Sequence, residues 1–193
     1  MKEAVGKLQY WVVDFVYGSL DGVVTTFAVV AGVVGANLPV SIILIMGAAN
    51  LFADGFSMSI GRYMSGTSED ELLVQLKKRR TKLSRHIYIE DKMLSPLKAA
   101  LVTFVAFIGV GTVPLLPYAY HFLYPLPASS LFGLTIAATL LALFLVGIVK
   151  GWALNEHKIR SGLGAMFIGG AAAAVAYYVG YWIKNVLMIN GGI

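Results

Sequence analysis

Three aspartates stand in stretches of the chain that are otherwise apolar, which is an unusual environment for a carboxylate. Asp14, Asp21 and Asp54 each lie within or at the edge of a long hydrophobic run. At the centre of a lipid bilayer an aspartate costs about 2.5–3.5 kcal/mol on insertion scales, so it needs a partner, water or a ligand. The three residues therefore mark a candidate cation site or proton relay, although Asp14 could instead be a solvated helix end.

Two of these aspartates are expected to lie at the same depth. Asn37 and Pro39 interrupt the first apolar run and predict a turn over 35–39, from which Asp21 and Asp54 are almost equally distant along the chain. At a rise of ~1.5 Å per helical residue, each lies about 24 Å from the turn. Two carboxylates at one level repel each other unless a cation or a shared proton lies between them.

Helical spacing adds further candidate metal ligands. Asp14 and Asp21 are seven residues apart and share one helix face, while Asn50, Asp54 and Met58 follow one another at intervals of four. Oxygen ligands alone suit Mg²⁺ or Ca²⁺, whereas a thioether favours Fe²⁺, Co²⁺ or similar transition ions, with Mn²⁺ also compatible. Met58 has an alternative role as a flexible filler of the core.

The composition excludes a water-soluble domain. Of the 193 residues, 58% are hydrophobic and 13% are charged, whereas about a quarter are charged in ordinary soluble domains. No Asp, Glu, Lys or Arg occurs in 22–53, 99–149 or 161–183, and a membrane span needs roughly 20 apolar residues. The chain has no cysteine, which excludes disulfides, thiolate metal sites and a cysteine nucleophile.

These stretches predict an all-α integral membrane protein with five transmembrane helices in a single domain over 1–193. A cytoplasmic linker is expected over 66–95, and a loop containing Tyr, Leu and Pro over 117–127. The predicted helices cover 11–36, 39–65, 96–117, 129–150 and 162–187.

The distribution of basic residues predicts the orientation. In a five-span arrangement 14 of the 15 Lys and Arg residues fall on the side of the amino terminus, and only Lys184 falls on the other. By the positive-inside rule the amino terminus is cytoplasmic. The net charge of +5 therefore reflects topology and attraction to anionic lipid, and it does not indicate a nucleic-acid partner.

Small residues four apart predict close helix contacts. Gly18 with Gly22, and Gly169 with Ala173, form pairs of the small-xxx-small type, which let backbones approach and could also form a dimer seam. Because five helices hardly enclose an aqueous pathway, we expect a homodimer in which two copies of the first helix line it.

The segments around these residues resemble the vacuolar iron transporter family. The resemblance spans nearly the whole chain and rests on Asp-Gly and Ser-Met elements that occur in order. The matching segments are 14–22 (DFVYGSLDG), 27–32 (FAVVAG), 49–63 (ANLFADGFSMSIGRY), 95–101 (SPLKAAL), 114–118 (PLLPY) and 149–151 (VKG).

The resemblance implies a dimeric transporter that moves Fe²⁺, and often Mn²⁺, out of the cytosol in exchange for protons. It places Asp21 and Met58 in the translocation path, with Asp14 as a second acid nearer the entrance. It implies no cofactor besides the transported metal. Many plant-type members have Glu where this chain has Asn50, and Asp54, one turn along, could supply that carboxylate.

The connection between the second and third helices is another departure from the family. Plant-type members carry a long Glu-rich cytosolic insert there, whereas this chain has only about thirty residues. Glu69 and Glu71 could form a weak metal antechamber or simply a solvated helix end. The missing insert favours a prokaryotic cytoplasmic membrane.

Other functions remain open at this point. A transporter of Co²⁺, Ni²⁺ or protons alone would need the same carboxylates, and in a non-transporting scaffold the acids would share a proton. An enzyme is not expected, because the chain has no HExxH, GxSxG or P-loop motif in a credible context.

Overall fold

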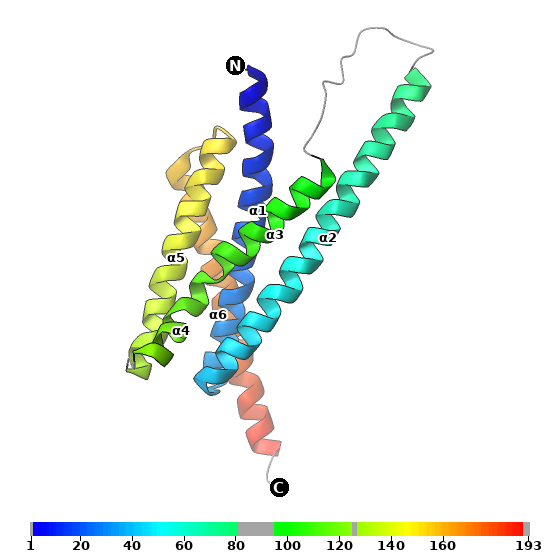
Figure 1. Ribbon diagram of the computed structural model, residues 1–193. Coiled ribbons are helices and arrows are strands. Elements are labelled where there is room, and N and C mark those ends of the chain that lie inside the picture. The colour runs from blue at the N-terminus through cyan, green and yellow to red at the C-terminus, as the bar shows by residue number, and fades with distance from the viewer. Residues whose placement is uncertain (1, 81–94, 125–126, 191–193) are drawn as a thin grey trace.

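The computed structural model describes residues 2–80, 95–124 and 127–190 and is shown in Figure 1. These ranges are helical and contain no strand, and five of the helices are long and apolar enough to cross a membrane. The expectation of an all-α integral membrane protein with five transmembrane helices is therefore confirmed. The elements are α1 (Lys2–Gly35), α2 (Val40–Arg80), α3 (Pro96–Gly111), η1 (Val113–Leu115), α4 (Leu116–Leu123), α5 (Ala128–Ala153) and α6 (Lys158–Asn190).

The second helix is much longer than predicted. It continues to Arg80, so residues 66–80, expected in a linker, are helical. The segment 67–80 contains neither Gly nor Pro and is rich in Glu, Leu, Lys and Arg, which are good helix formers. At ~1.5 Å per residue the whole helix is about 60 Å long, roughly twice the hydrocarbon thickness of a bilayer. Residues 81–94 of the expected linker lie outside the described ranges.

The third membrane segment is broken where one helix was expected. α3 ends at Gly111, and a short 3₁₀ turn containing Pro114 leads into α4. Proline lacks an N–H and clashes with the preceding turn, so it ends or kinks a helix. Pro117 in the first turn then suits the start of α4, and residues 116–123 are helical where a loop was predicted from 117.

Two asparagines end helices in the same way. Asn37 follows α1 with a φ of 54°, and Asn155 follows α5 with a φ of 53°. After α1, the N–H of Leu38 donates to the carbonyl of Val33 over 3.1 Å and that of Asn37 to Val34 over 2.8 Å. This is the Schellman pattern, in which a left-handed residue caps the last carbonyls. It fixes the sharp reversal between α1 and α2 that Asn37 and Pro39 predict.

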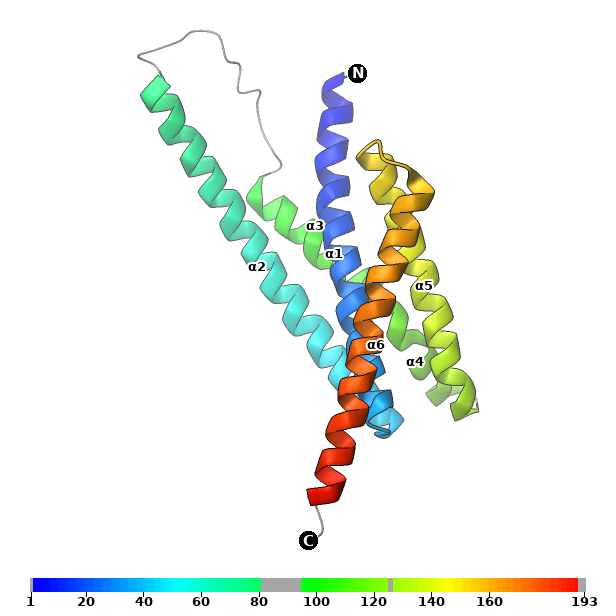
Figure 2. The same cartoon turned by 180° about the vertical axis from the view of Figure 1, so that it is seen from behind.

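α1 is the central helix of the bundle. It contacts α3, α5, α6 and α2, and Val23, Val30 and Ala31 on it are fully buried. Figure 2 shows α6 crossing α1 beside α5, while α2 diverges from the other helices toward its carboxyl end. The start of α1 and the end of α2 lie at one end of the molecule, which we call the amino-terminal end.

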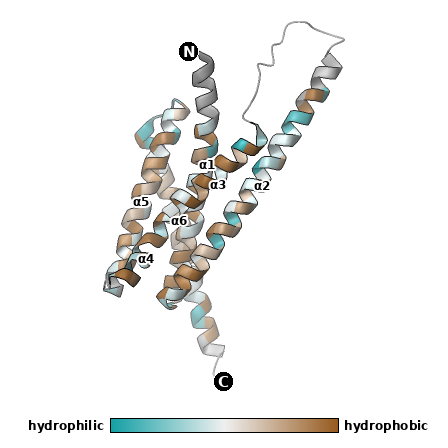
Figure 3. Cartoon of the chain, viewed as in Figure 1, coloured by the Kyte–Doolittle hydropathy of each residue, from teal (hydrophilic) through white to brown (hydrophobic). Residues whose placement is uncertain are grey.

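Glycines set the closest helix crossings. A Cβ on Gly35 would clash with the backbone of Tyr177, and one on Gly180 with the backbone of Gly32, so α1 and α6 touch backbone to backbone. In lipid, such contacts contribute van der Waals packing that burial of apolar surface cannot supply. Many large hydrophobic side chains are exposed, and hydrophobic residues recur along the helices (Figure 3), as a lipid-facing surface requires.

Candidate functional site

α3 is the platform on which α1 and α2 are placed. On α1, a Cβ at Gly18 or Gly22 would overlap the backbone carbonyls of Thr103 and Phe107 respectively. On α2, a Cβ at Gly55 would lie 3.2 Å from the side chain of Phe107. The small residues at 18 and 22 therefore serve a contact within the chain, and this pair is not available as a dimer seam.

Asp21 and Asp54 flank this platform. Asp21 precedes Gly22 and Asp54 precedes Gly55, so both acids are adjacent to the glycines that touch Phe107. Both are half-buried. Both acids thus stand next to residues that contact Phe107 of α3, and their joint binding of a metal ion stays a prediction.

Asn50, Asp54, Met58 and Arg62 follow one another turn by turn on the half-buried face of α2. The side-chain nitrogen of Asn50 is buried and has no hydrogen-bond partner. Met58 packs against the buried cluster that includes Phe107, which agrees with its alternative role as a core filler. The face therefore presents amide, carboxylate, thioether and guanidinium groups along one line. We call these four residues, together with Asp14 and Asp21 of α1, the polar stripe.

Asp14 is buried and paired with a basic residue. Its side chain is 6% exposed, and Oδ1 accepts a hydrogen bond from Nε of Arg62 over 2.7 Å. The alternative of a solvated helix end is therefore wrong. Sequence reasoning missed Arg62 as a member of the site, although Arg62 lies one turn after Met58 and as far from the Asn37 turn as Asp14 does.

The acidic residues expected near the membrane surface lie on the helical extension of α2. Glu69 is half-buried and its Oε1 accepts from Ser65 Oγ over 3.4 Å, whereas Glu71 is exposed. The exposure of Glu71 fits a solvated helix end. Across the part of the chain that the structure describes, no three His, Cys, Asp or Glu residues form a cluster able to hold a metal ion.

The polar stripe of one chain carries several side chains of the types that bind metal ions. Asp21 and Asp54 supply carboxylate oxygens, Asn50 an amide oxygen and Met58 a sulfur. This mixture of hard and soft donors is compatible with divalent first-row transition ions.

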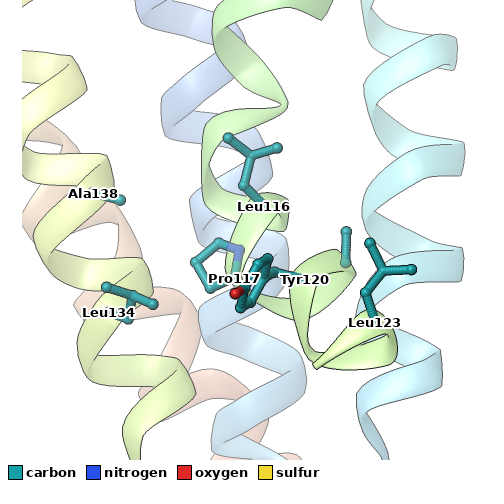
Figure 4. A pocket seen from close by; sticks show the side chains of 7 residues that line it. Leu116, Pro117, Tyr120, Leu123, Leu134 and Ala138 are labelled. Carbon is teal, nitrogen blue, oxygen red and sulfur yellow. The ribbon is translucent and has the colours of Figure 1, made fainter. Parts of the chain in front are cut away.

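The grooves on the outer surface have a different chemistry. One of about 510 Å³ lies between α4 and α5 and is lined by Leu116, Pro117, Tyr120 and Leu134, among others (Figure 4). None of the described residues that line it is acidic. Such a surface suits lipid acyl chains and offers no ligand for a cation.

The fold and the polar stripe define an integral membrane protein with buried and half-buried acidic groups on its membrane helices. The VIT family model matches this chain over residues 12–94 and 79–181. The chain therefore belongs to the VIT family, the vacuolar iron transporter family that its motifs resemble. This membership confirms the expectation of a membrane transporter and not an enzyme.

Relatives from distant organisms match most of the chain. The vacuolar iron transporter of Toxoplasma gondii is 28% identical over 91% of this chain and 75% of its own length. Vacuolar iron transporter 1 of Tulipa gesneriana is 28% identical over 90% of this chain and 87% of its own length. Vacuolar iron transporter homolog 4 of Arabidopsis thaliana is 31% identical over 85% of this chain and 79% of its own length. The similarity thus extends over most of the chain and is not confined to the motifs.

Proposed function

We propose that this protein exports Fe²⁺, Mn²⁺ or both from the cytosol in exchange for protons. The observation that carries the proposal is that Asp21 and Asp54, both half-buried on membrane helices, adjoin the glycines that contact Phe107, while Asn50 and Met58 lie one turn from Asp54. Half-buried carboxylates on membrane helices need a cation, a proton or water to offset their charge. The names of the relatives, vacuolar iron transporters, support iron as the cargo.

The direction of transport follows from the proposed orientation. Lys98, Lys150, Lys158 and Arg160 lie at the amino-terminal end of the bundle, together with the end of α2. The positive-inside rule assigns this end to the cytosol. Metal then enters between α1 and α2 beside Asp14 and leaves toward the Asn37 turn.

Proton exchange follows from competition for the same oxygen atoms. A carboxylate lone pair cannot bind a proton and a metal ion at once, so protonation of Asp21 and Asp54 releases the metal. Lower pH on the cytosolic side must therefore weaken metal binding. An acidic compartment on the other side drives release and supplies the energy for export.

Metal flux in reconstituted vesicles tests this function. We expect Asp21→Asn to reduce Fe²⁺ and Mn²⁺ flux under an imposed pH gradient by about 10- to 100-fold, the usual effect of disturbing a metal site. Asp70→Asn is the matched control, because Asp70 is exposed on the extension of α2. Wild-type flux through the Asp21 variant would refute the assignment. Competition by Co²⁺ and Ni²⁺ separates the possible metals.

We also propose that the transporter is a homodimer in which the two copies face each other across α1 and α2. Asp21 and Asp54 are only half-buried, and Tyr17 and Ser57 beside them are exposed, which leaves room for a second chain to complete the site. Because the chain has no cysteine, Ser57→Cys can be cross-linked selectively. A short bis-maleimide should give dimers with Ser57→Cys but not with Val175→Cys on α6, and equal cross-linking would contradict this interface.

A further inference from the structure

The ion pair between Asp14 and Arg62 closes the amino-terminal end of the polar stripe. Asp14 lies seven residues before Asp21 on the same face of α1, and Arg62 lies four residues after Met58 on the same face of α2. The pair therefore stands between the assigned cytosolic side and the acids that we propose bind metal. Any cation that follows the polar stripe inward meets this pair first.

The hydrogen bonding of the Asp14–Arg62 pair is incomplete. The contact joins Nε of Arg62 to Oδ1 of Asp14 over 2.7 Å, while Oδ2 of Asp14 is buried and has no hydrogen-bond partner. An arginine and a carboxylate often form two parallel hydrogen bonds, and this pair forms one. A buried carboxylate oxygen without a partner is costly, so Oδ2 is a place where a further positive group gains binding free energy.

The two partners differ in exposure. The side chain of Asp14 is 6% exposed and that of Arg62 is 22% exposed. The carboxylate is thus enclosed by the bundle, whereas the longer and more flexible arginine side chain retains some access to water. Arg62 is the partner that can leave.

We infer that Arg62 is a tethered cation that neutralises Asp14 until a divalent ion displaces it, and that this exchange selects divalent over monovalent cations at the entrance. A monovalent ion carries the same charge as the guanidinium and lacks its directed hydrogen bond. A divalent ion interacts twice as strongly with Asp14 at equal distance. The inference rests on the proposed cation transport, and it assigns Arg62 a role in specificity.

The alternative is that the pair only fastens α2 to α1, and three variants distinguish the two roles. Arg62→Gln removes the tethered charge, Arg62→Lys keeps it, and Asp14→Asn combined with Arg62→Gln removes both charges without leaving one buried and unpaired. Arg160→Gln is the matched control, because Arg160 is an exposed arginine at the same end of the molecule. Thermal unfolding of each purified variant shows whether it is folded.

Mn²⁺ flux into vesicles is measured in KCl and in choline chloride at equal ionic strength, so that screening is constant. In Arg62→Gln we expect the KM for Mn²⁺ to fall at least about tenfold, because a unit charge beside the ligand is removed. We also expect KCl to inhibit this variant while it leaves the wild type, Arg62→Lys and Arg160→Gln unaffected. In the double variant the KM should rise with kcat unchanged.

A purely structural pair predicts a different result. The variants would then lose thermal stability, while KM and the insensitivity to KCl stayed as in the wild type, and that outcome overturns the inference. If Arg62→Gln does not fold, the KM of the double variant decides between the two roles.

If the wild type itself transports no Mn²⁺, the proposed function fails. The inference is then judged by titrating the wild type and each variant with Mn²⁺ and measuring the bound ion by electron paramagnetic resonance. Binding that is tighter in Arg62→Gln supports it, and unchanged or absent binding overturns it.

Discussion

Replacing Gly22 by alanine should separate α3 from α1 and so disturb the position of Asp21. An alanine Cβ at this position would lie 2.5 Å from the carbonyl oxygen of Phe107, whereas ordinary van der Waals contact begins near 3.4 Å. The obstacle is backbone, so no side-chain rotation relieves the overlap. The two helices must move apart by about 0.9 Å, which follows from these distances.

The expected loss in the free energy of unfolding comes from overpacking. Forcing an additional carbon into a packed interior costs typically about 1–3 kcal/mol, and a backbone obstacle places this case toward the upper end. For a chain of this size each kcal/mol lowers the melting temperature by about 2–4 °C, so we expect a decrease of about 4–12 °C. Because Asp21 is adjacent to Gly22, Mn²⁺ affinity should fall as well.

Gly109→Ala provides the comparison. Gly109 lies on α3 and a Cβ there meets no atom within 4 Å, so alanine should leave stability unchanged or raise it by up to about 1 kcal/mol through helix propensity. Both variants are purified in mild detergent and their unfolding is followed by fluorescence. If Gly22→Ala melts at or above the temperature of Gly109→Ala, the close contact between α1 and α3 is not as described.

Two further predictions concern stability. Thr139 is fully buried on α5 and its hydroxyl has no hydrogen-bond partner, so Thr139→Val should stabilise the protein by about 1–3 kcal/mol because it removes an unsatisfied polar group; a lower melting temperature would show that internal water binds the hydroxyl. Asn155 has a left-handed φ of 53°, so Asn155→Val should cost about 1–2 kcal/mol whereas Asn155→Gly should not. Equal melting temperatures for these two variants would contradict the left-handed cap.

The depth of the acidic residues is readable from the sequence because helix geometry fixes it. Asn37 and Pro39 locate the turn, and a constant rise per residue then places Asp21 level with Asp54. The same arithmetic places Arg62 beside Asp14, but a basic residue near a helix end is ordinarily read as a topology signal. The pair was therefore missed although its spacing was visible.

The length of α2 and the break after α3 were predicted less well. Hydropathy shows where a helix leaves the membrane, but it does not show where the helix itself ends. The polar residues 66–80 were therefore assigned to a linker, although they continue α2. Pro114 and Pro117 suggest a loop, yet both fit turns that continue the segment as η1 and α4.

By itself the sequence determined that the chain is a membrane protein of five helices, because the length of a charge-free segment depends on local order alone. The equal depth of Asp21 and Asp54 stays a prediction from the helical rise. Only the tertiary structure decided which faces meet. The insertion of α3 against Gly22 and Gly55, and the burial of Asp14 under Arg62, depend on lateral packing between segments distant in the chain. Helical periodicity predicts on which face of its helix a residue lies, but it does not predict which other helix packs against that face.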